Sequence, residues 1–235
     1  MSETGNVVDN KVRLSNGDLL VFLGVSKENS EALMNCHLFS SLVASAEYFP
    51  TTEGEHWFNT YLKTMQTCGW IPIRFSYARE AASSQRFAVK QILAKAVGVG
   101  LAFASGGATA TASLLAVASD AVDTVAENPE ATALLDRTHS SKEGTSLNMA
   151  MCIQHPTGEV LLSVGCVQSE QAPPSTNDYL LFEWSSSHSD MYTGSAALVF
   201  HQSLYEILKD DIISRVGIKS KKEVLTLSIV PKQRS

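Results

Sequence analysis

The stretch Phe87–Val125, FAVKQILAKAVGVGLAFASGGATATASLLAVASDAVDTV, decides the fold. Residues 96–119 within it carry no charged side chain. A neutral segment of this length must be hidden from water, either in a protein core or in a lipid bilayer. Ser105-Gly106-Gly107 interrupts the segment, and glycine commonly closes a helix in the left-handed conformation. The stretch therefore predicts a helical hairpin over about residues 84–127.

Each predicted helix has one apolar stripe at helical spacing. The stripes consist of Val89, Ile92, Leu93, Ala96, Val97, Gly100 and Leu101, and of Leu114, Val117, Ala118, Ala121, Val122 and Val125. Asn128-Pro129 ends the second helix, because proline lacks an amide hydrogen and disfavours helical backbone before it. A bilayer-spanning helix needs about 20 predominantly apolar residues. Gly, Ser and Thr dilute this segment, so we expect a buried hairpin and no constitutive transmembrane helix.

Composition and charge narrow the class of protein. A chain of 235 residues with 44% hydrophobic content can bury a full core. The net charge of −6 disfavours a nucleic-acid binder. Residues 215–235 nevertheless carry six basic side chains against Glu223 alone, which suits anionic lipid as well as a solvated surface. We expect a flexible segment at 1–10, a single domain at 11–230 and a basic tail at 231–235.

The N-terminal sequence MSETGNVVDNK has no apolar segment of the kind a secretory signal peptide contains. We therefore expect synthesis in the cytoplasm, with release or export left open. The four cysteines and six histidines are dispersed without a metal-binding spacing, so neither a metal nor a cofactor is expected. A disulfide framework is not expected either, and Cys36 and Cys166 read as small buried hydrophobes.

No pattern predicts catalysis, so no catalytic residue is assigned. Cys68 lies at the predicted C-terminus of a helix, where the dipole disfavours a thiolate. The segment Ser185–Asp190 reads as a hairpin loop, because adjacent residues do not converge as a catalytic triad does. An enzyme of unrecognised chemistry remains an alternative, with Glu183 and His188 as its polar pair.

The order of elements predicts the fold class. In the first half of the chain we expect a β-hairpin around Asn16-Gly17, a helix at 28–48, a second helix that ends near residue 67, a strand at 70–77 and then the helical hairpin. A polar connector is expected at 127–144. The last third should contain strands at 147–154, 159–168, 179–185 and 195–201, a helix at 203–216 and a final strand at 224–230. The four strands before the last helix are expected to form an antiparallel meander. In the strand at 70–77, alternation puts Ile71, Ile73, Phe75 and Tyr77 on one face, and Pro72 favours a sheet edge. The result is a single α/β (α+β) domain with three layers, helices–antiparallel sheet–helices.

Two stretches carry a resemblance to a known family. They are LNMAMCIQHPTGEVLLSVG at 147–165 and YLLFEW at 179–184, which follow the helix pair. In pattern and spacing over about residues 85–217, the chain resembles the Cyt family of bacterial cytolytic δ-endotoxins and their fungal volvatoxin-type relatives. The likeness rests on no diagnostic motif, and no functional residue is transferred position by position.

The resemblance implies a non-enzymatic toxin or virulence protein that perforates membranes as its helices leave the sheet and the chains oligomerise. Small side chains make such a departure inexpensive and let helices approach closely in lipid. We expect membrane contact through Val97, Leu101, Phe103, Leu114, Leu115, Lys219, Lys221 and Lys222, with a hinge at Gly106 and Gly107. A protein-interaction or regulatory module, whose hairpin simply fills the core, is the alternative.

Overall fold

The computed structural model describes residues 10–15, 17–80, 87–105, 108–139, 144–170, 183–184, 190–217 and 224–229. The elements in these ranges are β1 (Lys11–Ser15), β2 (Asp18–Leu23), α1 (Lys27–Glu47), α2 (Gly54–Thr67), β3 (Trp70–Arg79), β4 (Phe87–Ala88), α3 (Val89–Ser105), α4 (Ala108–Ala126), α5 (Pro129–His139), β5 (Thr145–Gln154), β6 (Val160–Ser169), β7 (Glu183–Trp184), β8 (Met191–Phe200), α6 (Gln202–Val216) and β9 (Val224–Ser228). Residues 1–9 of the flexible segment predicted at 1–10, and the basic tail predicted at 231–235, lie outside the described residues.

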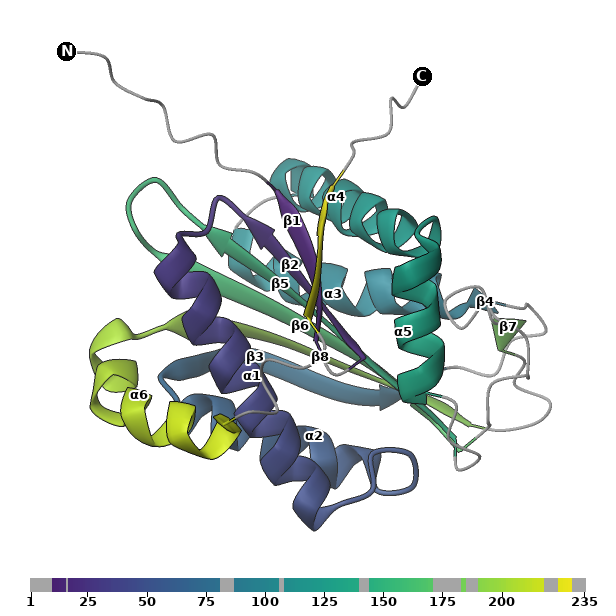
Figure 1. Ribbon diagram of the computed structural model, residues 1–235. Helices are drawn as coiled ribbons and strands as arrows, with labels where there is room; N and C mark the ends of the chain where they lie inside the picture. Colours follow the sequence, from purple (N-terminus) through teal and green to yellow (C-terminus); the bar gives the residue numbers. More distant parts are fainter. Residues whose placement is uncertain are drawn as a thin grey trace.

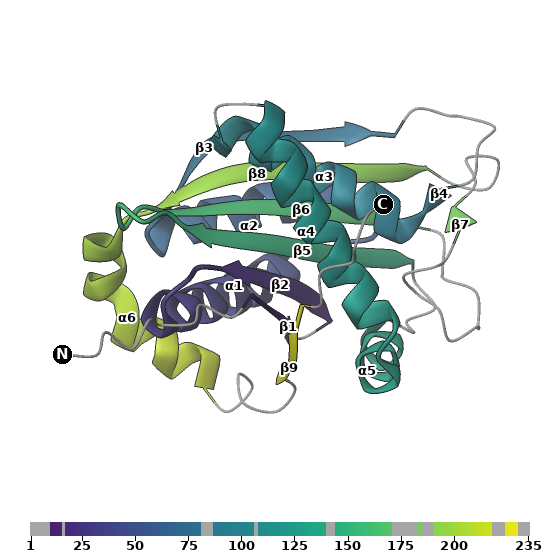
Figure 2. The ribbon, with the colours of Figure 1, turned by 90° about the horizontal axis from the view of Figure 1, so that it is seen from above.

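One seven-stranded sheet forms the middle of the molecule, with strand order β3-β8-β6-β5-β2-β1-β9 (Figures 1 and 2). The pairs within it are antiparallel except β2 with β5, which run parallel. The prediction of a mostly antiparallel sheet is therefore confirmed, with β2 and β5 as its one parallel pair among the described strands. The alternation of side chains shows which face a residue takes, but it does not say which strand becomes the neighbour.

Helices cover both faces of the sheet, as the three-layer prediction requires. Helices α1, α2 and α6 lie on one face, and α3, α4 and α5 lie on the other (Figure 1). Each face buries its own apolar cluster, and β2, β5, β6 and β8 contribute side chains to both. The predicted α/β (α+β) class is confirmed. A sheet covered on both faces also explains why β6 is apolar at most positions.

Two predicted hairpin turns are confirmed by their glycines. Gly17, between β1 and β2, has φ of +83°, and Gly158, between β5 and β6, has φ of +94°. The β5–β6 turn is closed where the amide of His155 donates to the carbonyl oxygen of Glu159 at 2.8 Å. Positive φ costs glycine little, so both turns could be read from the sequence.

The polar connector predicted at 127–144 is wrong, because it contains helix α5. The side-chain oxygen of Asn128 accepts from the amides of Glu130 and Ala131, each at 3.0 Å. Pro129 is the first helical residue, where its missing amide hydrogen is not needed. The Asn128-Pro129 pair ends α4, as predicted, and also begins the next helix.

The predicted four-strand meander is also wrong. In the described part of the segment at 179–185, β7 pairs with β4 in a separate two-stranded sheet. Strand β8 then lies directly beside β6, so the meander consists of β5, β6 and β8. The loop predicted at 172–175 lies outside the described residues.

Strand β3 lies at the edge of the sheet, as Pro72 predicted. Its alternation is not the predicted one, because the register with β8 shifts between Pro72 and Arg74. Trp70 and Tyr77 consequently both pack into the apolar cluster under α1 and α2, which strict alternation would forbid. The prediction that four alternate positions share one face is therefore wrong, and Ile73 is 55% exposed.

Candidate functional site

The predicted helical hairpin is present as α3 and α4, and its inner stripes face the sheet. On α3, Ala96, Val97 and Leu101 are at most 3% exposed, and on α4 Ala118 and Ala121 are fully buried. The turn residues Gly106 and Gly107 lie outside the described residues. The inner face of the hairpin thus consists largely of small apolar side chains.

Helix α3 lies unusually close to β6 and β8. A Cβ added at Gly100 would lie 2.6 Å from the carbonyl oxygen of Ala196, and one at Gly165 would lie 2.8 Å from the amide nitrogen of Val97. The hydroxyl of Ser163 donates a 2.7 Å hydrogen bond to the Val97 carbonyl oxygen. These contacts require glycine at both positions and bring the helix backbone against the sheet.

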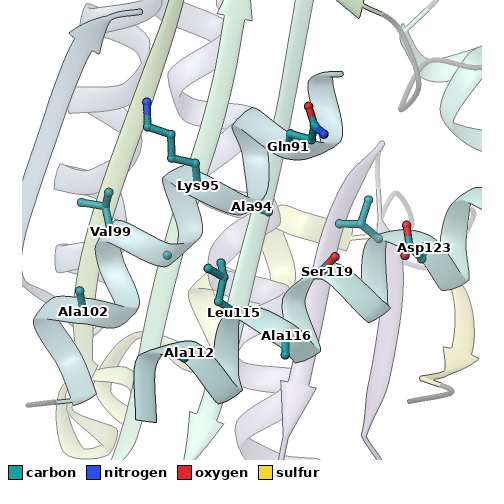
Figure 3. Close-up of a pocket in the computed structure, with 12 residues that line it drawn as sticks. Gln91, Ala94, Lys95, Val99, Ala102, Ala112, Leu115, Ala116, Ser119 and Asp123 are labelled. Carbon is teal, nitrogen blue, oxygen red and sulfur yellow. The ribbon is translucent and has the colours of Figure 1, made fainter. Parts of the chain in front are cut away.

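The outward side of the hairpin is a groove between α3 and α4 with a volume of about 820 Å³ (Figure 3). It is lined by Gln91, Ala94, Lys95, Gly98, Val99, Ala102, Ala112, Leu115, Ala116, Ser119, Val122 and Asp123. Leu115 lies across from Gly98, where an added Cβ would meet its side chain at 3.1 Å. Most of the lining is apolar, although the groove opens away from the sheet.

Polar side chains gather at one end of the groove. Gln91 and Lys95 on α3 lie at the same end as Ser119 and Asp123 on α4, because the helices are antiparallel (Figure 3). Lys95 donates to a carboxylate oxygen of Glu80 at 3.0 Å and is itself 67% exposed. The groove can therefore contact a ligand that has an apolar body and a polar end.

The residues predicted to contact a membrane lie in different places. Val97 and Leu101 are buried against the sheet, Leu114 packs at the margin of the core, and Leu115 lines the groove. The side chain of Phe103 lies outside the described part, as do Lys219, Lys221 and Lys222. Sequence reasoning missed the groove, although its small residues share the face opposite the inner stripes. A helical wheel of both helices could have shown it.

The residues considered for chemistry are not gathered into a site in the described part of the chain. His188 and the side chain of Glu183 lie outside that part. Cys68 is 1% exposed, and a hydrogen bond from the Cys36 side chain lowers its pKa against the opposing effect of burial. Burial raises the pKa of the Cys166 thiol to about 12.

Among the described residues, no group of three or more His, Cys, Asp or Glu side chains could hold a metal ion. Within the same ranges, no helix is both long enough and apolar enough to cross a membrane.

Comparison with known proteins gives only weak likenesses. No protein-family model and no curated protein matches the sequence. Among solved structures, the Evf virulence factor is similar, with 12% identity and a TM-score of 0.31, over 94% of this chain and 85% of the other. A delta-endotoxin is similar over 79% of this chain and 84% of the other, with 14% identity and a TM-score of 0.35. These values describe a distant resemblance of fold to a toxin and a virulence factor.

Proposed function

We propose that this protein is a non-enzymatic membrane-binding protein whose α3–α4 hairpin is the lipid-contacting element. One observation carries the proposal. The hairpin is uncharged from residue 96 to 119, yet only its inner face is covered by the sheet, and its outer face forms the open groove. A helix that is apolar on every side is normally buried in a core or in lipid.

The inner contacts support a second step, in which the hairpin leaves the sheet and the molecules assemble into a pore. Burial contributes about 0.8 kcal/mol per CH₂ group, so the glycines and alanines facing the sheet hold α3 less firmly than leucines would. The released inner face, with Val97 and Leu101, would then also meet lipid. Small residues would let hairpins from several copies pack closely within the membrane.

Vesicle flotation and dye release test this function. The protein is mixed with vesicles of phosphatidylcholine, alone or with anionic phosphatidylserine, and the floated fraction and released dye are measured. We expect co-flotation with at least one vesicle type, and leakage if pores form. Flotation without leakage would support membrane binding and rule out pore formation. Neither flotation nor leakage with either vesicle between pH 5 and 8 would overturn the proposal.

A matched pair of variants locates the contact. Ala102→Glu with Ala112→Glu puts two charges on exposed positions of the groove without touching the core. Ile207→Glu with Ile213→Glu adds the same two charges at exposed apolar positions of α6, 76% and 44% exposed, on the opposite face. We expect the groove variant to stop flotation and the α6 variant to float like the parent. The reverse result would move the lipid contact away from the hairpin.

A protein-interaction module is the second candidate, and the groove favours it for a specific reason. Its volume and apolar lining suit one face of an amphipathic helix, and Lys95 and Asp123 at one end could orient that helix by charge. A parent protein that ignores vesicles but binds an amphipathic helical peptide, with loss of binding in the Ala102→Glu and Ala112→Glu variant, would favour this candidate.

A further inference from the structure

The outer face of the α3–α4 hairpin is open in the described part of the structure. Ala102 on α3 and Ala112 on α4 are exposed, and Gly98 between the two helices is half-buried. Leu115 is the largest apolar side chain of the groove lining (Figure 3). Small side chains let the axes of packed helices approach to about 8 Å. This face can therefore pack closely against another pair of helices.

The charged side chains of the groove have a defined arrangement. Among the described lining residues, Lys95 on α3 and Asp123 on α4 are the charged ones, and both lie toward the end of the hairpin away from its turn (Figure 3). Gln91 and Ser119 are the polar side chains beside them. One wall of the groove is thus positive and the other negative at the same end.

A second copy of the chain matches this arrangement by symmetry. If two hairpins meet face to face with a two-fold axis along the groove, α3 of one copy lies against α4 of the other. The axis preserves the level along the groove, so Lys95 of each copy lies near Asp123 of the other and two equivalent ion pairs form. A two-fold axis perpendicular to the groove would instead place the charged end of one copy against the uncharged turn end of the other.

The levels of the two side chains allow this pairing. Lys95 lies ten residues before the end of α3, and Asp123 lies fifteen residues after the start of α4. At 1.5 Å per residue they are about 15 and about 22 Å from the turn, a difference that a lysine side chain can span. Lys95 keeps its contact with Glu80 as well, because an ammonium group has three donors.

The directions of the helices support the same axis. Helices α3 and α4 are antiparallel within one copy, and a two-fold axis along the groove leaves the direction of each helix unchanged. Helix α3 is then also antiparallel to α4 of the other copy. The two hairpins form a four-helix bundle in which each helix has antiparallel neighbours, so the dipoles of adjacent helices attract each other.

The size of the face indicates a reversible association. Helices of 17 and 19 residues are about 26 and about 28 Å long, and two of them side by side make a face about 20 Å wide. Two copies together would cover roughly 1,000 Å², which is the lower limit for a specific interface. We therefore expect a dimer that exchanges with its monomer at micromolar concentrations.

We propose that two copies of this protein associate in water through their α3–α4 grooves, with Lys95 of each copy paired with Asp123 of the other. The dimer covers the uncharged face that the monomer presents to lipid. Dilution, or a membrane that competes for the hairpin, releases the monomer. This regulatory role rests on the proposed function, whereas the association itself does not.

Sedimentation velocity of the full chain without lipid tests the association. The protein concentration is raised from about 1 to about 200 µM, which brackets the affinity of a small interface. We expect the weight-average mass to rise from that of the 25.4 kDa monomer toward twice that value. A mass that stays at the monomer value throughout would overturn the proposal.

Two charge-reversal variants test the pairing and the axis. Lys95→Glu and Asp123→Lys each put like charges opposite each other at both symmetric sites, so each variant alone should dimerise about ten-fold or more weakly. Mixed in equal amounts, the two variants restore both opposite-charge pairs and should form a heterodimer about as tight as the parent dimer. If mixing gives no recovery while both variants keep the circular dichroism of the parent, the pairing is refuted.

A neutral variant and a remote one complete the comparison. Lys95→Gln with Asp123→Asn removes both charges without adding repulsion, so it keeps the test open if a reversal variant does not fold. It should dimerise more weakly than the parent, and unchanged association would refute the ion pairs. Ile207→Glu with Ile213→Glu, on the opposite face, should dimerise like the parent, and loss of its dimer would move the interface to α6.

Sedimentation and vesicle flotation separate the two proposals. A protein that floats with vesicles but stays monomeric at every concentration keeps the proposed function and excludes the dimer. A protein that dimerises with the expected charge dependence but never floats keeps the dimer and excludes the proposed function.

Discussion

The Ser163 hydroxyl on β6 donates a hydrogen bond to the backbone carbonyl oxygen of Val97 on α3, 2.7 Å away. This bond joins the sheet to the backbone of the helix, and the side chain of Val97 is fully buried beside it. Because the acceptor is a backbone atom, this hydrogen bond attaches α3 to the sheet independently of the side chains on the helix.

Ser163→Ala should weaken this attachment. Losing one buried hydrogen bond lowers the free energy of unfolding by about 1 kcal/mol, measured by urea denaturation. If α3 must leave the sheet to release dye, the same variant should leak vesicles faster. Tyr77→Phe is the control, because it removes a 2.9 Å bond to Gln168 on the opposite face. Equal leakage rates in the two variants would show that the release of α3 from the sheet does not limit dye release.

Two glycines on α3 should respond oppositely to alanine. At Gly100 the new Cβ would meet the Ser163 hydroxyl and the Ala196 carbonyl oxygen, so Gly100→Ala should destabilise the protein by about 1–3 kcal/mol. At Gly98 the neighbour is a terminal methyl of Leu115, which can move, and alanine favours a helix by about 1 kcal/mol over glycine. Gly98→Ala should therefore be neutral or stabilising. Thermal unfolding of both variants compares them, and equal shifts would contradict the close approach at Gly100.

A zero-length cross-link can hold the hairpin in place. Lys95 on α3 and Glu80 after β3 are 3.0 Å apart, so carbodiimide treatment should join them by an amide bond, with loss of water to the reagent. We expect cross-linked protein, verified by peptide mass spectrometry, to lose dye release. Lys95→Arg keeps the charge but cannot form the amide, so treatment should leave its release unaltered. Full leakage from cross-linked protein would show that α3 stays on the sheet during the process.

The four cysteines should be unreactive in the folded protein. Each is at most 1% exposed and none is paired. Burial also raises the pKa of Cys36 and Cys166, which keeps the reactive thiolate scarce. Iodoacetamide at pH 8 should label all four only in urea. Rapid native labelling at any site would contradict the burial of these thiols.

Local chemistry made several elements predictable. Gly17 and Gly158 define their hairpins, and the stripes of α3 and α4 give the helical hairpin and its buried face. Helix α5 was missed because Asn128-Pro129 serves equally as the end of one helix and the beginning of another.

Features that join distant segments could not be predicted. The parallel pairing of β2 with β5 depends on the whole sheet, as does the pairing of β7 with β4. Buried hydrogen bonds join Tyr61 on α2 to His37 on α1, and Asp18 on β2 to both His37 and Asn148 on β5. None of these four residues lies in a sequence motif. The groove between α3 and α4 is different, because helical wheels of the two helices taken together would have indicated its lining.

The position of β1 and β2 between β9 and β5 has a consequence for biosynthesis. This ribbon is synthesised before both of its partners, because β5 begins at Thr145 and β9 at Val224. Such contact order makes folding slow. Both long edges of the ribbon must wait for late segments of the nascent chain, so chaperones that shield strand edges should matter most for this protein while translation is still under way.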